Sequence, residues 1–314
     1  MVNKIKNEKI NRVNRWSDLR AHEIMIRDKL RTLSYKKAIE DNIKSGDAVL
    51  DVGCGTGILS FFAAKKGCKK VYAIDKSAII DDAKKTAQLN NLQDCVEFIK
   101  IDILKFKPKE KMDVILHDQI GNFVWDEGLI SKITYARDRF LSQGGTMIPY
   151  KIDLCFVPVD YESAFEKSIL FWSKKKYALN FNNLAKKMLI QQIYNSLHPY
   201  IIKLKNKKVF LCKEKLIYSI DLKKEKRLPE KLTANFNLKK GSRLTGMCIY
   251  FKVHLDKKNI FSTAPRAVNS HWGQIFLPSF EQKQIKQDSV LNFTLFPQIS
   301  PKKWKFEFKI IKKT

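Results

Sequence analysis

The sequence has no long apolar run, and its first residues carry no apolar segment. A membrane-spanning helix needs roughly 20 consecutive apolar residues, and no stretch of the 314-residue chain comes close to that. Met1–Trp16 is polar and charged, without the apolar centre of a secretion signal. We therefore expect a cytoplasmic protein with no membrane partner.

Paired cysteines are also lacking. Six cysteines are present, but no two of them form a C-x-x-C pair. Without such a pair we expect neither a disulfide framework nor a zinc site, and a reducing compartment is the default.

Negative charge is scarce. The chain holds 60 Lys and Arg against 32 Asp and Glu, a net charge of +28. Residues 151–314 contribute +21 of this, with 33 basic against 12 acidic side chains. Such a field attracts nucleic acid or acidic partners, although a genome-wide lysine bias produces the same excess. No nucleic-acid-binding motif accompanies the charge, so nucleic acid is not the favoured partner.

Apolar strands alternate with helices through residues 46–150. Before them, Arg20–Lys44 has the apolar spacing of one helix or a bent pair, so residues 1–45 are treated as a helical segment. The expected strands are Ala48–Val52, Lys70–Ile74, Val96–Ile101, Asp113–His117 and Thr146–Ile148. The expected helices are Ile58–Lys66, Ser77–Asn90 and Glu127–Leu141. This alternation predicts an α/β fold with a Rossmann-like, doubly wound parallel sheet in residues 46–150.

After Pro149 the apolar residues alternate with a period of two. The strands expected from this pattern are Ile152–Val159, Lys207–Leu211, Leu216–Leu222, Met247–Leu255, Ser289–Phe296 and Trp304–Ile311. They suit an antiparallel barrel or sandwich, and we predict a β-barrel domain in residues 151–314. Phe165–Tyr194 has aromatic and helical patterning instead, which predicts an inserted helical arm.

A glycine-rich segment directly follows the first strand. It reads Asp51-Val-Gly53-Cys-Gly55-Thr-Gly57, with a glycine at every second position. Glycines let the backbone turn tightly and approach a ligand closely. Sites for NAD space their glycines as G-x-G-x-x-G to hold a pyrophosphate. The spacing here, opened by an acid suited to a cationic aminoacyl group, favours S-adenosylmethionine; the alternatives are a dinucleotide site and a chance turn.

Two further acids stand where such a cofactor needs them. Asp75 ends the second strand, where a carboxylate accepts hydrogen bonds from both ribose hydroxyls. Asp102 follows the third strand and is a candidate acceptor for the adenine amino group. The alternative for Asp102 is a solvated loop aspartate.

Several motifs together resemble the protein arginine methyltransferase family. The matching segments, in chain order, are His22–Leu33, Val49–Ser60, Tyr135–Arg139, Gly144–Pro149, Phe261–Pro265 and Ser270–Trp272. The resemblance implies that Arg31 pairs with the cofactor carboxylate through its planar fork. It also implies that Met25 packs beside the sulfonium, although core packing explains Met25 equally well. Asp75 stands where the family usually has Glu.

The resemblance also implies a substrate hairpin after the fourth strand, where two acids grip a guanidinium. Asp118 and Glu127 occupy the positions of these acids, with Asp one methylene shorter than the usual Glu. The usual aromatic residues after the first acid are replaced by Gln119 and Asn122. Because methyl transfer is an in-line displacement, positioning is expected to supply most of the rate. The alternative is a surface hairpin with incidental acids.

The family's His-Trp loop projects over the site, and its histidine pairs with an N-terminal acid. His271 and Trp272 match this loop, so we predict a catalytic role for His271 and a packing role for Trp272. Asp18 is the acid expected to pair with His271. His117 precedes the first clamp acid and receives no role.

Three functions remain open. The leading hypothesis is N-methylation of a guanidinium or similar nitrogen in a peptide or protein. The alternatives are methylation of a small molecule, such as an amino acid derivative, and a non-catalytic protein that binds through its basic face. The arm at Phe165–Tyr194 matches the family's dimerisation arm in position, which predicts a homodimer.

Overall fold

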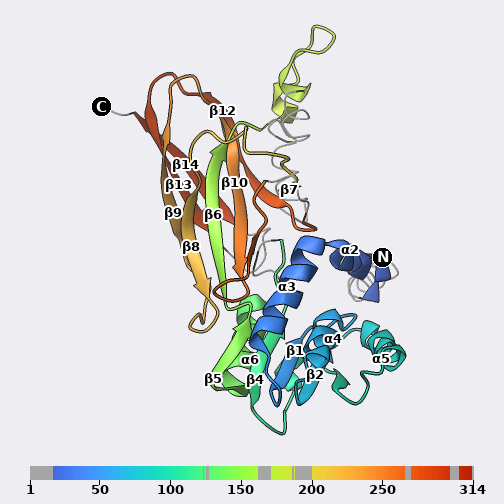
Figure 1. Cartoon of the computed structure of the whole chain (residues 1–314). Helices are drawn as coiled ribbons and strands as arrows, with labels where there is room; N and C mark the ends of the chain where they lie inside the picture. Colours follow the sequence, from blue (N-terminus) through green and yellow to red (C-terminus); the bar gives the residue numbers. More distant parts are fainter. Residues whose placement is uncertain are drawn as a thin grey trace.

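The first half of the chain forms a parallel sheet of five strands. The computed structural model describes residues 17–122, 124, 127–161, 171–185, 187, 200–265, 270–297 and 304–312. The sheet order is β3-β2-β1-β4-β5 (Figure 1). Its strands are β1 (Ala48–Val52), β2 (Lys70–Asp75), β3 (Val96–Lys100), β4 (Met112–His117) and β5 (Leu141–Ile148). The order reverses between β1 and β4, which confirms the predicted doubly wound sheet.

Two helices precede this sheet, α2 (Leu19–Arg27) and α3 (Lys29–Asn42), and they confirm the expected bent pair. The bend falls at Asp28, which ends α2 and caps α3: its Oδ1 accepts the backbone N–H of Arg31 at 3.0 Å. Such a cap satisfies a backbone donor that the helix itself leaves unpaired. Asp28 therefore decides where α3 begins and how Arg31, in its first turn, is aimed.

The helices between the strands are close to those expected. They are α4 (Ile58–Lys65), α5 (Ile79–Leu89), the short η2 (Ile103–Lys105) and α6 (Thr134–Phe140). One element differs: the predicted helix Glu127–Leu141 opens with a π-helical turn, η3 (Leu129–Ile133), before α6. Such turns are rare and frequently lie at functional sites.

The second half is built from antiparallel sheets. A six-stranded sheet has the order β7-β12-β10-β6-β8 with β11 paired to β10, and a three-stranded sheet has the order β14-β13-β9. Their strands are β6 (Lys151–Val159), β7 (Tyr200–Ile202), β8 (Lys215–Asp221), β9 (Leu232–Leu238), β10 (Arg243–His254), β11 (Ile260–Ser262), β12 (Gln274–Gln284), β13 (Ser289–Phe296) and β14 (Lys305–Lys312). The strand predicted at Lys207–Leu211 is wrong, since only an isolated bridge joins Phe210 to Val159 there.

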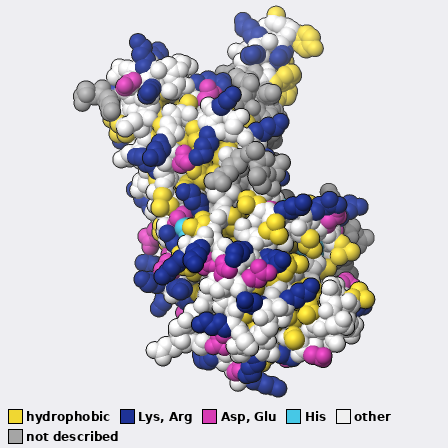
Figure 2. Space-filling model, in the orientation of Figure 1, with side chains coloured by type: hydrophobic (Ala, Val, Ile, Leu, Met, Phe, Trp, Pro, Cys, Tyr) yellow, Lys and Arg dark blue, Asp and Glu magenta, His cyan; other side chains and the backbone are white. Residues whose placement is uncertain are grey.

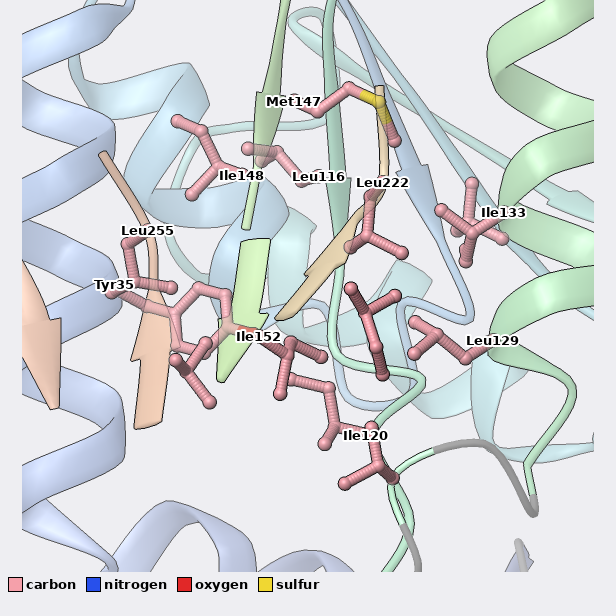
Figure 3. Close-up of a cluster of buried hydrophobic side chains, with 14 of the residues drawn as sticks. Tyr35, Leu116, Ile120, Leu129, Ile133, Met147, Ile148, Ile152, Leu222 and Leu255 are labelled. Atoms are coloured by element: carbon pink, nitrogen blue, oxygen red, sulfur yellow. The ribbon is translucent and has the colours of Figure 1, made fainter. Parts of the chain in front are cut away.

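One continuous hydrophobic core joins the two halves. At the junction, side chains from α3, β4, β5 and η3 meet side chains that follow β8 and β10 (Figure 3). Polar contacts reinforce the seam: Arg137 of α6 donates to the carbonyl oxygens of Leu222 and Glu225, each at 2.7 Å. Asn42, at the end of α3, donates to Asp256 at 2.6 Å. The two halves are thus held in one orientation.

The described part of the arm, residues 171–185, projects from the β-rich half (Figure 1). Trp172 packs between Phe171 and Phe181, with ring centroids 5.1 and 6.2 Å apart. The remainder of the predicted arm lies outside the described residues. No described helix is long and apolar enough to cross a membrane.

Phe293 is the side chain whose loss should test this core most directly. It is fully buried in β13 and packs against Phe156 and Phe308, at 5.8 and 5.0 Å between ring centroids. Phe293→Ala should destabilise the chain by about 3–5 kcal/mol, because transfer and cavity terms add. Urea denaturation measures this loss. Leu89→Ala, at a position 85% exposed, is the control and should change stability by less than about 0.5 kcal/mol.

Candidate functional site

The site lies where the order of the parallel sheet reverses. β1 and β4 are neighbours, with Val52 in register with His117, the last residue of each strand. The next residues, Gly53 and Asp118, therefore leave the sheet side by side at its carboxyl edge. Crevices at such a switch point are where open α/β sheets bind their ligands.

The glycine segment forms the bend that its spacing predicts. Gly53 has a φ of 74°, and a Cβ built there would stand 2.2 Å from the side-chain Nε2 of Gln119. Gly55 has a φ of 54°, and its Cβ would stand 2.9 Å from Cε1 of His22. Any larger residue would be strained and would collide with its neighbours. The first turn of α4 follows, and Gly57 before it supplies no side-chain cap.

Asp75 lies against this bend. Its Oδ2 accepts the backbone N–H of Gly55 at 3.0 Å, and its Oδ1 accepts the backbone N–H and the hydroxyl of Ser77 at 2.8 and 2.7 Å. A carboxylate offers about four acceptor positions, so a ribose hydroxyl can still be accommodated. The bend and Asp75 thus fit the nucleoside of S-adenosylmethionine. The ribose contact itself stays a prediction.

Asp51 is buried rather than open to a ligand. It is 1% exposed, and its Oδ2 accepts the hydroxyl of Ser60 at 2.6 Å. Burial raises the pKa of Asp51 to about 7 despite the hydrogen bonds from Ser60. The predicted contact with a cationic aminoacyl group remains untested; in the structure the carboxyl group anchors the start of α4 to β1.

Asp102 and Met25 have local roles. Asp102 caps η2, its Oδ1 accepting the N–H of Leu104 at 3.0 Å, and its other oxygen lies 3.9 Å from Nζ of Lys76. The carbonyl oxygen of Met25 accepts Nη1–H of Arg31 at 3.2 Å. Their predicted contacts with adenine and the sulfonium stay predictions.

Arg31 and Asp118, predicted to serve different ligands, form a buried ion pair. Nε of Arg31 lies 2.6 Å from Oδ2 of Asp118, and both side chains are almost fully buried. The hydroxyl of Tyr35 lies 3.0 Å from Oδ1 of Asp118 and 3.0 Å from the carbonyl oxygen of His117. Burial alone would lower the pKa of Arg31, but the charge and hydrogen bond of Asp118, together with Tyr35 and Asp28, outweigh burial and leave that pKa raised. Asp118 is thus neutralised within the chain, a role that sequence reasoning missed.

Glu127 stands at the far end of the hairpin, just before Gly128 and η3. The hairpin is marked by an antiparallel bridge between Gly121 and Val124, while 123, 125 and 126 lie outside the described residues. Nζ of Lys132 donates to the backbone carbonyl of Glu127 at 2.9 Å. Lys132 carried no signal in the sequence, because its role depends on the turn of η3.

The acid that pairs with His271 is Asp28, not Asp18. Oδ2 of Asp28 lies 2.8 Å from Nδ1 of His271 and accepts its backbone N–H at 2.7 Å and the hydroxyl of Ser270 at 3.1 Å. Asp18 instead caps α2, accepting the N–H of Arg20. The sequence placed the acid too early, although Asp28 lies inside the matching motif at His22–Leu33.

Asp28 stays ionised, which determines which nitrogen of a neutral His271 imidazole carries the proton. Burial would raise its pKa, but the bonds from His271 and Arg31 outweigh burial and lower the pKa to about 2. A carboxylate only accepts hydrogen bonds, so Nδ1 of His271 carries the proton. Nε2 of the neutral imidazole then keeps a lone pair.

Trp272 and His117 are structural. Trp272 is 3% exposed, stacks on Phe261 with ring centroids 5.6 Å apart, and donates its indole N–H to the carbonyl oxygen of Ile120 at 2.8 Å. The predicted packing role is confirmed, and the indole also holds the start of the hairpin. His117 is fully buried with Nε2 3.2 Å from the carbonyl oxygen of Pro149, and burial lowers its pKa to about 3.

A glycine bend at the switch point, with an acid ending the neighbouring strand, defines an α/β enzyme that binds a nucleoside cofactor. A family model described as ribosomal protein L11 methyltransferase matches residues 32–148. A model described as the arginine methyltransferase oligomerization subdomain matches residues 151–309. The two matches together span both halves of the chain.

Relatives found by sequence comparison are named as protein arginine methyltransferases. Protein arginine N-methyltransferase 1 of Dictyostelium discoideum is 30% identical over 89% of this chain and 82% of its own length. Protein arginine N-methyltransferase 6 of Danio rerio is 30% identical over 90% of this chain and 83% of its own length. The chain belongs to the protein arginine methyltransferase family and is an S-adenosylmethionine-dependent methyltransferase.

Solved structures support the fold. A Trypanosoma brucei PRMT1 enzyme-prozyme heterotetrameric complex with AdoHcy has a TM-score of 0.81 at 22% identity, covering 95% of both chains. Arabidopsis thaliana protein arginine methyltransferase 10 has a TM-score of 0.80 at 23% identity, covering 95% of this chain and 94% of its own.

The buried Asp51 carboxyl should make stability depend on pH. Because folding raises its pKa from 3.8 to about 7, the native state binds the extra proton, and stability falls as pH rises between these values. Asp51→Asn removes this pH dependence. The free energy of unfolding of the variant, relative to that of the wild type, should therefore rise by up to about 4 kcal/mol between pH 4 and pH 8. Urea titrations at several pH values measure the difference. Parallel curves for the two proteins would contradict it.

Proposed function

We propose that the chain transfers a methyl group from S-adenosylmethionine to a guanidinium nitrogen of arginine in a protein. The observation that carries the proposal is the acidic hairpin, which begins at Asp118 beside the glycine bend and returns to Glu127. Small-molecule methylation and a purely binding role are less favoured, because relatives named as protein arginine methyltransferases align over most of this chain.

S-adenosylmethionine supplies an electrophilic methyl group on its sulfonium. The chain's task is to position the acceptor nitrogen in line with that methyl group, which accounts for most of the rate in such displacements. Glu127 neutralises the guanidinium and orients its nitrogen. Asp118 acts through Arg31, whose Nε it holds at 2.6 Å, and so aims Arg31 at the cofactor carboxylate. The two acids therefore have different roles.

His271 completes the acceptor site from the β-rich half. Asp28 holds its Nδ1–H at 2.8 Å, which leaves Nε2 as an acceptor for a guanidinium N–H. Because the same carboxylate caps α3 at Arg31, the acceptor and cofactor sides of the site share one anchor.

The charge of the β-rich half opposes this acceptor at long range. Residues 151–314 carry +21, and on the face shown in Figure 2 Lys and Arg side chains are dispersed over both halves. Dispersed charge is screened beyond about 10 Å at 0.1 M salt. The local acids therefore govern binding once the acceptor reaches the site.

Glu127→Gln tests the proposal. Removing the negative charge while keeping the shape should lower kcat by about 100-fold or more and leave cofactor affinity nearly unchanged. Labelled S-adenosylmethionine with arginine-containing peptides measures turnover, and calorimetry measures cofactor binding. Glu110→Gln is the matched control, because Glu110 is only partly buried and pairs with Lys69 at 2.7 Å, away from the site.

Each other outcome of these assays has a defined meaning. Label on small metabolites alone would replace the protein acceptor with a small-molecule one. Failure to bind the cofactor would favour the binding role. Unchanged turnover in Glu127→Gln would remove the acid from the mechanism.

The chain is further proposed to form a homodimer through its arm. Exposed apolar side chains occur in two separate regions. One is the arm, with Phe171, Tyr177 and Leu179; the other is the helix pair α2 and α3, with Leu19, Ile24 and Leu33. Figure 2 shows hydrophobic side chains on the projecting arm. Burial of one set against the other in a second copy would remove both from water. A cytoplasmic location is also proposed, supported by six free cysteines.

Leu179→Asp should convert the dimer to a monomer, because it places a charge in the apolar contact. Light scattering measures the mass of the wild type and the variant. Leu89→Asp, at an exposed apolar position on α5, is the control and should leave the mass unchanged. A monomeric wild type would refute the dimer.

A further inference from the structure

Lys132 makes two polar contacts inside the site. Its Nζ donates to the backbone carbonyl of Glu127 at 2.9 Å and to Oε1 of Gln119 at 3.3 Å. Glu127 and Gln119 stand on opposite sides of the hairpin, so one ammonium group joins the two sides. A backbone carbonyl fixes the position of its own residue, so this contact bears directly on where Glu127 lies.

Gln119 extends the connection to the cofactor bend. Its amide carbonyl faces Lys132, and its Nε2 lies 2.2 Å from where a Cβ of Gly53 would stand. The absence of a side chain at Gly53 therefore admits the Gln119 amide. A continuous path runs from Gly53 through Gln119 and Lys132 to Glu127.

The turn before η3 makes room for the lysine. Gly128 has a φ of 90°, and a Cβ there would stand 2.9 Å from Cε of Lys132. The lysine stem therefore lies along the backbone of Gly128 and brings the ammonium back to Glu127. Because this contact needs glycine at 128 and lysine at 132, the two positions act together.

Charges on neighbouring elements surround the ammonium. Burial lowers the pKa of Lys132 and the positive charge of Lys76 lowers it further, while Asp102, Glu127 and Asp75 oppose both effects; the net result is a lowered pKa. Asp75 ends β2, Asp102 follows β3, and Glu127 belongs to the hairpin. Lys132 thus stands among the acids predicted to serve the cofactor and the acceptor.

We propose that Lys132 is a positioning residue that, through Gln119, ties the backbone of Glu127 to the cofactor bend at Gly53. Lys132 holds the acceptor acid at a fixed distance from the transferable methyl group. The pair Gln119 and Lys132 performs this task together. The inference rests on the proposed function, since it names what positions Glu127.

Lys132→Met keeps the length of the stem and removes the ammonium. Misplacement of the acceptor should lower kcat/KM for an arginine peptide by about 10- to 100-fold, with cofactor affinity changed less than about threefold. Lys132→Arg should recover most of the loss, because the charge and donors are retained. Lys111→Met is the matched control: Lys111 also donates to a backbone carbonyl, that of Arg139 at 2.7 Å, but it precedes β4 at the opposite edge of the sheet. Its kinetics should match the wild type.

The pH profile separates positioning from general stabilisation. In the wild type, activity should fall with rising pH as Lys132 loses its proton, and this fall should begin at a pH below the ordinary pKa range of lysine. In Lys132→Arg this fall should move beyond the measured range, since guanidinium keeps its proton. An alkaline limb that is the same in both proteins would overturn the proposal.

A double-mutant cycle tests whether Gln119 and Lys132 act together. The double variant with Gln119→Leu and Lys132→Met should have a kcat/KM only slightly lower than that of either single variant, because each change breaks the same path. If the fold losses of kcat/KM in the two single variants multiply in the double variant, the two residues act independently and the link through Gln119 is overturned.

Hydrogen exchange separates failure of this inference from failure of the proposed function. Exchange is measured with no acceptor present. Backbone amides in residues 127–133 should exchange about tenfold faster in Lys132→Met than in the wild type, and their exchange rates in Lys111→Met should equal those of the wild type. If the wild type methylates no arginine peptide, the proposed function fails, yet faster exchange still supports the tie to Glu127. Unchanged exchange overturns that tie even if the wild type is active.

Discussion

The carboxylate of Asp28 is the contact on which the site depends. One oxygen starts α3 and so sets the direction of Arg31; the other accepts three donors from Ser270 and His271 in the β-rich half. A buried charge is stable only when such donors surround it. The loop that carries His271 is therefore tied to the helix that carries Arg31, and both sides of the site are aligned by one side chain.

The shared core explains why a single carboxylate can hold this alignment. α3 packs against elements of both halves, and Trp272 of the β-rich half reaches the hairpin through the carbonyl oxygen of Ile120. Arg137 joins α6 to the loop after β8. With these contacts on either side, the halves cannot shift without breaking buried hydrogen bonds. Arg31 and His271 are thereby kept in a fixed arrangement, as a positioning mechanism requires.

Local patterns made much of the fold predictable. β1 and β13 have the expected bounds, because a short, mainly apolar run and a segment rich in β-branched and aromatic residues each favour a strand. β9 was missed although Leu232–Leu238 alternates between buried and exposed residues, since its polar half resembles a loop. Lys207–Leu211 shows the reverse error: it lies beside the end of β6, but the pairing there is limited to the bridge between Phe210 and Val159 and does not extend into a strand. Within the site, motifs located Arg31, Asp75 and His271, but not their partners. Asp28 and Tyr35 act through contacts between distant elements, which no local pattern records. Lys132 acts through the π-helical turn of η3, which the sequence did not predict.

The pairing of charges inside the site bears on how an acceptor is selected. Asp118 is matched by Arg31, Asp28 contacts His271, and Asp102 lies near Lys76. These acids therefore add little field beyond the site, while residues 151–314 repel cations at long range. Attraction at a distance mainly raises association rates, whereas desolvated contacts mainly slow dissociation. Under the proposed function, selection of a guanidinium would then depend on close contact with Glu127 and His271. Such a site would discriminate by how long the correct group stays bound, which would make the placement of Glu127 decisive.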